Sequence, residues 1–128
     1  MPRTFTLQEA TALVPRLTEL LTEIGETKRA LDGMREELTQ MSRVARGNGR
    51  LQEVRRRQRV ARETAERLNK LLGEVQQLGC ELKGLDEGLV DFPTERDGRT
   101  VYLCWKLGEE RVAYWHELDS GFAGRQPL

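Results

Sequence analysis

Apolar residues in the first part of the chain recur at alternating intervals of four and three positions. This series consists of Leu13, Leu17, Leu20, Ile24, Thr27, Leu31, Met34, Leu38, Met41 and Ala45. Such heptad spacing, with one polar interruption at Thr27, predicts a long helix with an apolar seam along one side. A second series at the same spacing consists of Leu51, Val54, Gln58, Ala61, Ala65, Leu68, Leu72, Val75 and Gly79. The two seams favour a pair of helices that pack against each other.

Local signals mark where the helical region begins and where it is interrupted. Thr6 is a favourable N-cap, and Glu9, three residues later, completes a capping box. Pro15 is expected to bend the helix or to separate residues 7–14 as a short segment, because proline has no backbone N–H. The glycines in residues 46–50 predict a tight turn between the two long helices.

After residue 79 apolar and polar residues alternate, which is typical of β-strands. The expected strands are Cys80–Lys83, Leu89–Pro93, Val101–Leu107 and Val112–Leu118. Pro93 is expected to end the second strand, since proline cannot donate to a ladder of hydrogen bonds. Asp97-Gly98 predicts a hairpin turn between the second and third strands, and residues 109–110 are taken as the centre of the next turn.

These turn centres fix a predicted register for the antiparallel sheet. The predicted pairs are Val90–Trp105, Phe92–Leu103, Asp91–Cys104, Trp105–Tyr114, Cys104–Trp115 and Leu103–His116. In this register His116 lies on the apolar face of the sheet, and Cys104 lies on the opposite, mixed face. A shift of one residue would exchange these partners.

Together these elements predict a single α+β domain over residues 1–128. An antiparallel, coiled-coil-like helical hairpin spans residues 6–79, and a small antiparallel sheet spans residues 80–118. Leu21, Val14 and Leu71 widen the apolar stripe at the base of the hairpin. A two-helix hairpin rarely buries enough apolar area alone, so the sheet, a second copy of the chain, or both are expected to cover this stripe. A homodimer is therefore favoured.

The C-terminal tail, residues 119–128, is rich in glycine but contains Phe122 and Arg125, which favour docking over disorder. We expect Arg125 to hold the tail through an ion pair, with Glu117 or Asp119 as the acceptor. The alternative is an anionic ligand that binds to Arg125 in a pocket. The other residues assigned to this ligand site are Trp115, Phe122, Asp91 and Cys104.

A divalent metal is the other ligand considered, with His116, Asp119 and Glu117 as candidate ligands. His116 is the single histidine of the chain and lacks a partner at metal-type spacing. A packed histidine that hydrogen-bonds to the backbone of the tail is therefore favoured. Cys104 has no base opposite it in the predicted register, which favours a structural thiol over a nucleophile. No catalytic residue is assigned.

Charge is balanced overall, with 21 Lys and Arg against 21 Asp and Glu, but it is unevenly distributed. Residues 80–128 contain six basic and ten acidic side chains, so residues 1–79 contain fifteen and eleven. The candidate nucleic-acid-binding residues in the basic half are Arg55, Arg56, Arg59 and Arg62. Nearby glutamates and the absence of interleaved aromatic residues favour a solvated helix face instead. Nucleic acid is thus a disfavoured partner.

The remaining sequence features concern the cellular compartment. No apolar run is long enough to span a membrane, and residues 1–4 lead into a helix rather than into a signal peptide. Cys80 and Cys104 lack the spacing of a metal motif and suggest no disulfide framework. A cytoplasmic protein with reduced thiols and no membrane partner is expected.

Four stretches carry a resemblance to a known family. They are Phe5-Thr-Leu-Gln-Glu-Ala10, Gly88-Leu-Val-Asp-Phe-Pro93, Val101-Tyr-Leu-Cys-Trp-Lys-Leu-Gly-Glu109 and Tyr114-Trp-His-Glu-Leu-Asp-Ser-Gly-Phe-Ala-Gly-Arg125. Together they resemble the prokaryotic domain of unknown function 2203 family over nearly the whole chain. The resemblance implies a bacterial cytoplasmic protein with its distinctive motifs on the sheet and the tail, and it brings no activity.

The sequence therefore favours a non-enzymatic, self-associating interaction module. The first alternative is a protein that binds a metal or a small anion on the sheet and the tail. The second is a protein that binds nucleic acid or another anion through the arginines near the helical turn.

Overall fold

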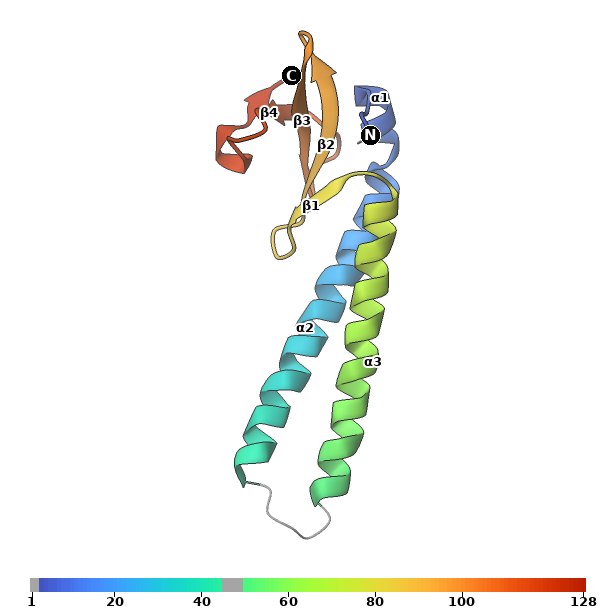
Figure 1. Cartoon of the computed structure of the whole chain (residues 1–128), viewed down its shortest axis with the longest axis vertical. Helices are drawn as coiled ribbons and strands as arrows, with labels where there is room; N and C mark the ends of the chain where they lie inside the picture. Colours follow the sequence, from blue (N-terminus) through green and yellow to red (C-terminus); the bar gives the residue numbers. More distant parts are fainter. Residues whose placement is uncertain (1–2, 45–49) are drawn as a thin grey trace.

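The computed structural model describes residues 3–44 and 50–128, and it confirms the predicted α+β fold. The helices are α1 (Leu7–Ala12), α2 (Val14–Val44) and α3 (Arg50–Gln77), with a short 3-10 helix, η1, at Phe122–Gly124. The strands are β1 (Glu81–Gly84), β2 (Leu89–Arg96), β3 (Arg99–Lys106), β4 (Tyr114–His116) and β5 (Gln126–Pro127). The sheet sits at one end of a long helical hairpin formed by α2 and α3 (Figure 1). Of the predicted turn at 46–50, residues 46–49 lie outside the described residues, and Arg50 is the first residue of α3.

The predicted helix start and the predicted interruption at Pro15 are both confirmed. The Thr6 Oγ1 accepts from the Glu9 N–H at 3.1 Å, and the Thr6 N–H donates to Glu9 Oε1 at 2.8 Å, which completes the capping box. Helix α1 ends at Ala12 and α2 begins at Val14, because Pro15 has no N–H with which to continue the helical ladder.

The two seams meet along the hairpin. Burial decreases away from the sheet along the α2 seam, whereas the α3 seam remains buried at Val54 and Ala61. On α2, Leu17 and Ile24 are almost fully buried, and on α3 so is Val75, whereas Leu51 is 58% exposed. Ion pairs between exposed side chains also connect α2 and α3; they join Arg57 to Glu37, Arg67 to Glu23 and Arg16 to Glu74. None of the helices within residues 3–44 and 50–128 combines the length and apolar character needed to cross a membrane.

The five strands form one antiparallel sheet in the order β1-β2-β3-β4-β5. The β2–β3 register is as predicted: Val90 pairs with Trp105, Asp91 with Cys104 and Phe92 with Leu103. Asp97 and Gly98 adopt positive φ values of 52° and 78°, which is the conformation of a tight two-residue hairpin turn.

The prediction that Pro93 ends its strand is wrong, because β2 continues to Arg96. β1 pairs with β2 only as far as Asp91. At Pro93 the side of β2 that faces β1 therefore has no strand paired with it. The N-terminal segment forms hydrogen bonds with this edge of β2. The Phe5 N–H donates to the Pro93 carbonyl at 2.7 Å, and the Thr94 hydroxyl donates to the Phe5 carbonyl at 2.6 Å. A proline is tolerated at an edge position of this kind.

The predicted β3–β4 register is wrong by one residue. The observed pairs are Tyr102–His116, Leu103–Trp115 and Cys104–Tyr114, and the predicted strand at residues 112–118 is reduced to Tyr114–His116. The loop is centred on Glu109, whose N–H donates to the Lys106 carbonyl at 2.9 Å, while Glu109 Oε1 accepts from the Lys106 N–H at 2.7 Å. The shift moves His116 to the face of Cys104 and moves Trp115 to the apolar face.

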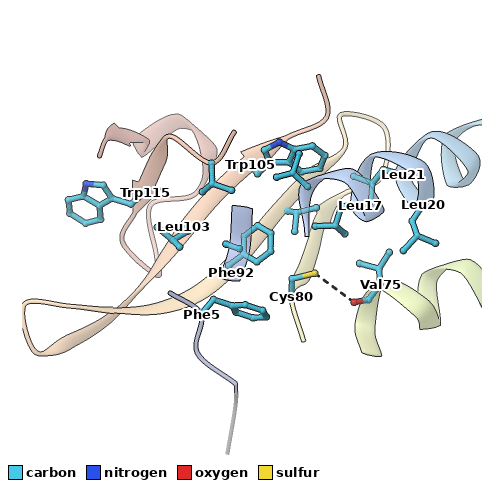
Figure 2. Close-up of a cluster of buried hydrophobic side chains, with 14 of the residues drawn as sticks. Phe5, Leu17, Leu20, Leu21, Val75, Cys80, Phe92, Leu103, Trp105 and Trp115 are labelled. Atoms are coloured by element: carbon cyan, nitrogen blue, oxygen red, sulfur yellow. Dashed lines mark hydrogen bonds between the residues drawn. The ribbon is translucent and has the colours of Figure 1, made fainter. Parts of the chain in front are cut away.

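The apolar face of the sheet covers the base of the hairpin, where the sequence predicts a wide apolar stripe that has to be buried. Figure 2 shows Phe92 and Trp105 of the sheet beside Leu17 and Leu21 of α2. The buried residues of this core are Phe5, Ala10, Val14, Leu17, Leu20, Leu21, Ile24, Leu71, Val75, Cys80, Val90, Phe92, Val101, Leu103, Trp105, Val112 and Trp115. The tail runs on the opposite side of the sheet, away from the helices (Figure 1).

Self-association remains a prediction, and burial now restricts the surface available for it. Leu17 is fully buried, whereas Val60 on α3 is 41% exposed and lines a hollow of about 300 Å³ with Met34 and Arg57. We expect the mass measured by light scattering to increase with protein concentration, and Val60→Asp to keep the protein monomeric and folded. A monomer mass that stays constant up to high micromolar concentration would contradict the prediction.

Candidate metal centre

Three buried donor side chains meet on the face of the sheet that is turned away from the helices. They are Asp91 on β2, Cys104 on β3 and His116 on β4, which are 4%, 1% and 1% exposed. One potential ligand atom from each residue lies within 4.8 Å of those of the other two. The β2–β3 register places Asp91 opposite Cys104, and the β3–β4 register places His116 opposite Tyr102, two residues from Cys104 on the same face.

The two ring nitrogens of His116 both face oxygen atoms. Nδ1 lies 2.7 Å from the Glu117 carbonyl oxygen, and Nε2 lies 3.0 Å from Asp91 Oδ1. A carbonyl oxygen can only accept, so Nδ1 carries the proton that it donates to Glu117. The lone pair of a neutral imidazole then points from Nε2 toward a carboxylate oxygen. Either a second proton or a cation has to lie between these two acceptors, since they would otherwise repel each other.

The environment of Cys104 keeps its thiol protonated when no cation is present. Burial, assisted by the negative charge of Asp91, raises the pKa of the Cys104 thiol to about 12, although the positive charge of Arg125 opposes this shift. A thiol with this pKa is not a nucleophile at neutral pH. A bound cation reverses this situation, because a coordinating thiol is deprotonated.

Other side chains pack on either side of the cluster. On one side, the Tyr102 ring lies 5.5 Å from the His116 ring, and Lys83 Nζ lies 4.9 Å from the Tyr102 ring centroid. Burial is the largest cause that raises the pKa of Tyr102, followed by its hydrogen bond with Glu81. Lys83 also forms an ion pair with Glu81 at 3.1 Å, so its charge is compensated.

The tail packs on the other side through Arg125. The guanidinium carbon of this residue lies 3.9 Å from the Tyr114 ring centroid and 4.6 Å from that of Phe122. Arg125 Nη2 donates to both carboxylate oxygens of Glu109, at 2.9 and 2.7 Å. The Arg125 and Glu109 side chains are 11% and 27% exposed, and Arg125 Nε is buried without a hydrogen-bond partner among the described residues.

The structure brings together only part of the predicted metal set. His116 belongs to the cluster, but its neighbours are Asp91 and Cys104, which the sequence predicts as part of a site for an anionic ligand. The Glu117 carboxylate forms an ion pair with Arg99, and only the Glu117 carbonyl reaches His116. Asp119 is exposed. The Asp97-Gly98 turn had already placed Asp91 opposite Cys104, so the missing signal was the β3–β4 register.

The predicted anion pocket is divided between the two faces of the sheet. Trp115 lies on the helix-facing side, where the Arg96 guanidinium packs 4.7 Å from its ring centroid. Phe122 and Arg125 are together on the other side. Arg125 forms its ion pair with Glu109, rather than with either acceptor expected from the sequence.

The arginines proposed for nucleic acid lie at the other end of the molecule, on α3. Arg55, Arg56, Arg59 and Arg62 are all exposed. Arg56 forms a 2.7 Å ion pair with Glu53, so part of the charge is locally compensated. Binding of nucleic acid through these arginines remains a disfavoured prediction.

A comparison with models of protein families identifies the family of this chain. The model of a family described as an uncharacterised conserved protein, DUF2203, matches residues 3–128. The chain belongs to the DUF2203 family. The match to DUF2203 includes the three cluster residues and the tail, and it confirms the resemblance found in the sequence. No curated protein and no solved structure matches the chain. The DUF2203 assignment therefore brings no activity.

Proposed function

We propose that this DUF2203 protein binds a divalent transition-metal ion of the zinc type through Asp91, Cys104 and His116. The observation that carries the proposal is the orientation of His116, whose Nδ1 faces the Glu117 carbonyl while Nε2 faces Asp91 Oδ1. Histidine ligands in metal sites commonly donate their second N–H to a carbonyl or carboxylate in this way.

Charge balance supports a divalent ion. The Asp91 carboxylate and a Cys104 thiolate supply two negative charges, and a neutral His116 supplies none, so a divalent ion would leave the buried cluster neutral. The adjacent cationic side chains of Arg125 and Lys83 are already paired with carboxylates. A cation in the cluster would therefore compensate the Asp91 carboxylate, together with the Cys104 thiolate that forms when the thiol coordinates the ion.

The types of donor favour zinc or cobalt over magnesium or calcium. A thiolate and an imidazole are ligands of the softer transition metals, whereas magnesium and calcium prefer oxygen. Three protein ligands leave one position of a tetrahedral zinc ion for water or a small ligand. The proposal is limited to metal binding and assigns no reaction.

The test is cobalt and zinc titration of protein purified without an affinity tag. We expect one equivalent of Co²⁺ to bind, with a thiolate-to-cobalt absorption band that Zn²⁺ abolishes. His116→Ala, Asp91→Asn and Cys104→Ser are each expected to weaken binding by about 100-fold or more, because loss of an outer partner alone weakens metal sites by about 10–100-fold.

Glu117→Gln is the matched control. Its carboxylate pairs with Arg99 outside the cluster, and the variant keeps the carbonyl that faces His116. We expect it to bind metal as the parent does. The proposal is wrong if the parent binds no transition metal at micromolar concentration, or if His116→Ala binds as tightly as Glu117→Gln does.

A further inference from the structure

The C-terminal tail packs beside the buried cluster, on Tyr114. After β4 the chain turns at Ser120, whose N–H donates to the Glu117 carbonyl at 3.3 Å, and then forms η1. It returns as β5, alongside β4. Between these points Arg125 lies over Tyr114, the residue that pairs with Cys104. Figure 1 shows this segment on the side of the sheet away from the helices.

The tail is attached to the sheet by few backbone contacts. β5 has only two residues, which pair with Tyr114 and Trp115, and one further bond runs from the Leu128 N–H to the Ala113 carbonyl at 3.0 Å. Residues 119–123 and 126–128 are exposed. Segments with few buried contacts open locally at a lower free energy than the whole fold does. The tail is therefore expected to detach before the rest of the sheet.

The Arg125–Glu109 pair anchors the tail through side chains. Its two hydrogen bonds to one carboxylate are charge-assisted and partly shielded from water, and the guanidinium also packs on two aromatic rings. Glu109 is itself fixed, because Oε1 accepts from the Lys106 N–H in the β3–β4 loop. The Arg125–Glu109 pair therefore connects the weakly attached end of the chain to a rigid point of the sheet.

We propose that the tail gates the Asp91–Cys104–His116 site, with the Arg125–Glu109 pair as the latch. When the latch is closed, the donors are shielded and a bound ion is retained. When Arg125 leaves Glu109, the tail moves away and ions or small ligands reach the site. The control of ion exchange by this gate rests on the proposed metal binding. The access of a reagent to Cys104, in contrast, can be measured without any metal.

The test measures labelling of Cys104 by a thiol reagent in metal-free protein that carries Cys80→Ala. Glu109→Gln removes the charge of the latch but keeps an oxygen that can accept from Lys106. We expect Cys104 in Glu109→Gln to react about tenfold faster than in the parent, since loss of one charge-assisted hydrogen bond changes an opening equilibrium by about that factor. Glu110→Gln, at the exposed neighbouring position, is expected to leave the rate unchanged.

A second reporter separates opening of the tail from unfolding of the core. Cys80 is buried on the helix side, where its thiol lies 3.7 Å from the Val75 carbonyl. In protein that carries Cys104→Ser, labelling of Cys80 is expected to be equally slow with and without Glu109→Gln. The gate is refuted if Glu109→Gln leaves the Cys104 rate unchanged, or if it accelerates Cys80 and Cys104 equally.

The metal arm of the experiment keeps the two proposals distinct. In metal-loaded protein, Glu109→Gln is expected to transfer its ion to a chelator about tenfold faster than Glu110→Gln does. If no variant binds metal, the proposed function fails while the labelling result still decides the gate. If metal binds but labelling and transfer are the same in both variants, the gate fails and the metal site stands.

Discussion

Leu17→Asp is expected to leave the protein unfolded at room temperature. Leu17 is fully buried at the base of α2, in the core that contains Phe92 and Trp105 (Figure 2). Loss of a buried leucine side chain alone costs about 2–5 kcal/mol, and burial of an unpaired carboxylate adds several kcal/mol more. The total approaches the stability of about 5–15 kcal/mol that is typical of a domain. Circular dichroism of the purified variant is the measurement.

Leu51→Asp is the matched control for this substitution. Leu51 belongs to the second seam but is 58% exposed in the first turn of α3, where a negative charge is favourable. The same change of residue type should therefore shift the thermal midpoint only slightly. A Leu17→Asp variant that is as helical and as stable as Leu51→Asp would show that the sheet does not cover the hairpin as described.

Gly88→Ala is expected to cost about 3 kcal/mol of stability, the sum of a backbone cost and a packing cost. Gly88 has a φ of +68°, and a Cβ at this position would lie 2.7 Å from the Leu107 Cβ. The two backbone segments are fixed at this distance, because the Leu107 N–H donates to the Gly88 carbonyl at 2.9 Å. A left-handed backbone with a side chain costs about 1–2 kcal/mol, and overpacking adds about 1–3 kcal/mol. Urea denaturation measures the loss.

Gly98→Ala separates the two parts of this cost. Gly98 has a φ of +78° in the β2–β3 turn, but a Cβ at this position would meet no described residue within 4 Å other than its chain neighbours. This variant should therefore lose only the backbone contribution, about 1 kcal/mol. Equal losses in the two glycine variants would mean that the contact with Leu107 relaxes without a penalty.

The parts of the fold that the sequence predicted correctly depend on local signals. Thr6 and Glu9 lie three residues apart, and Pro15 interrupts the helix through its own missing N–H. Asp97 and Gly98 likewise form their turn from two adjacent residues, so the β2–β3 register and the Asp91–Cys104 pair were predictable.

The remainder of the site depends on contacts that no local pattern encodes. The β3–β4 loop spans residues 107–113, and its centre is set by contacts of Glu109 with the Lys106 N–H, the Trp105 indole and Arg125. Arg125 is sixteen residues away from Glu109 in the sequence. Since the position of this loop determines which face His116 occupies, the sequence could name His116 but could not place it with Asp91 and Cys104.

The hydrogen bond from Thr94 to the Phe5 carbonyl has a consequence for the order of folding. It joins residues 89 positions apart, so it cannot form until most of the chain has been synthesised. The helical hairpin consists of contacts that are closer in sequence and should form earlier. Without β2 and β3, the apolar base of the hairpin, including Leu17, Leu21 and Val75, is exposed. A chain released after residue 80 is therefore expected to aggregate or to recruit chaperones, and the released full-length chain is not.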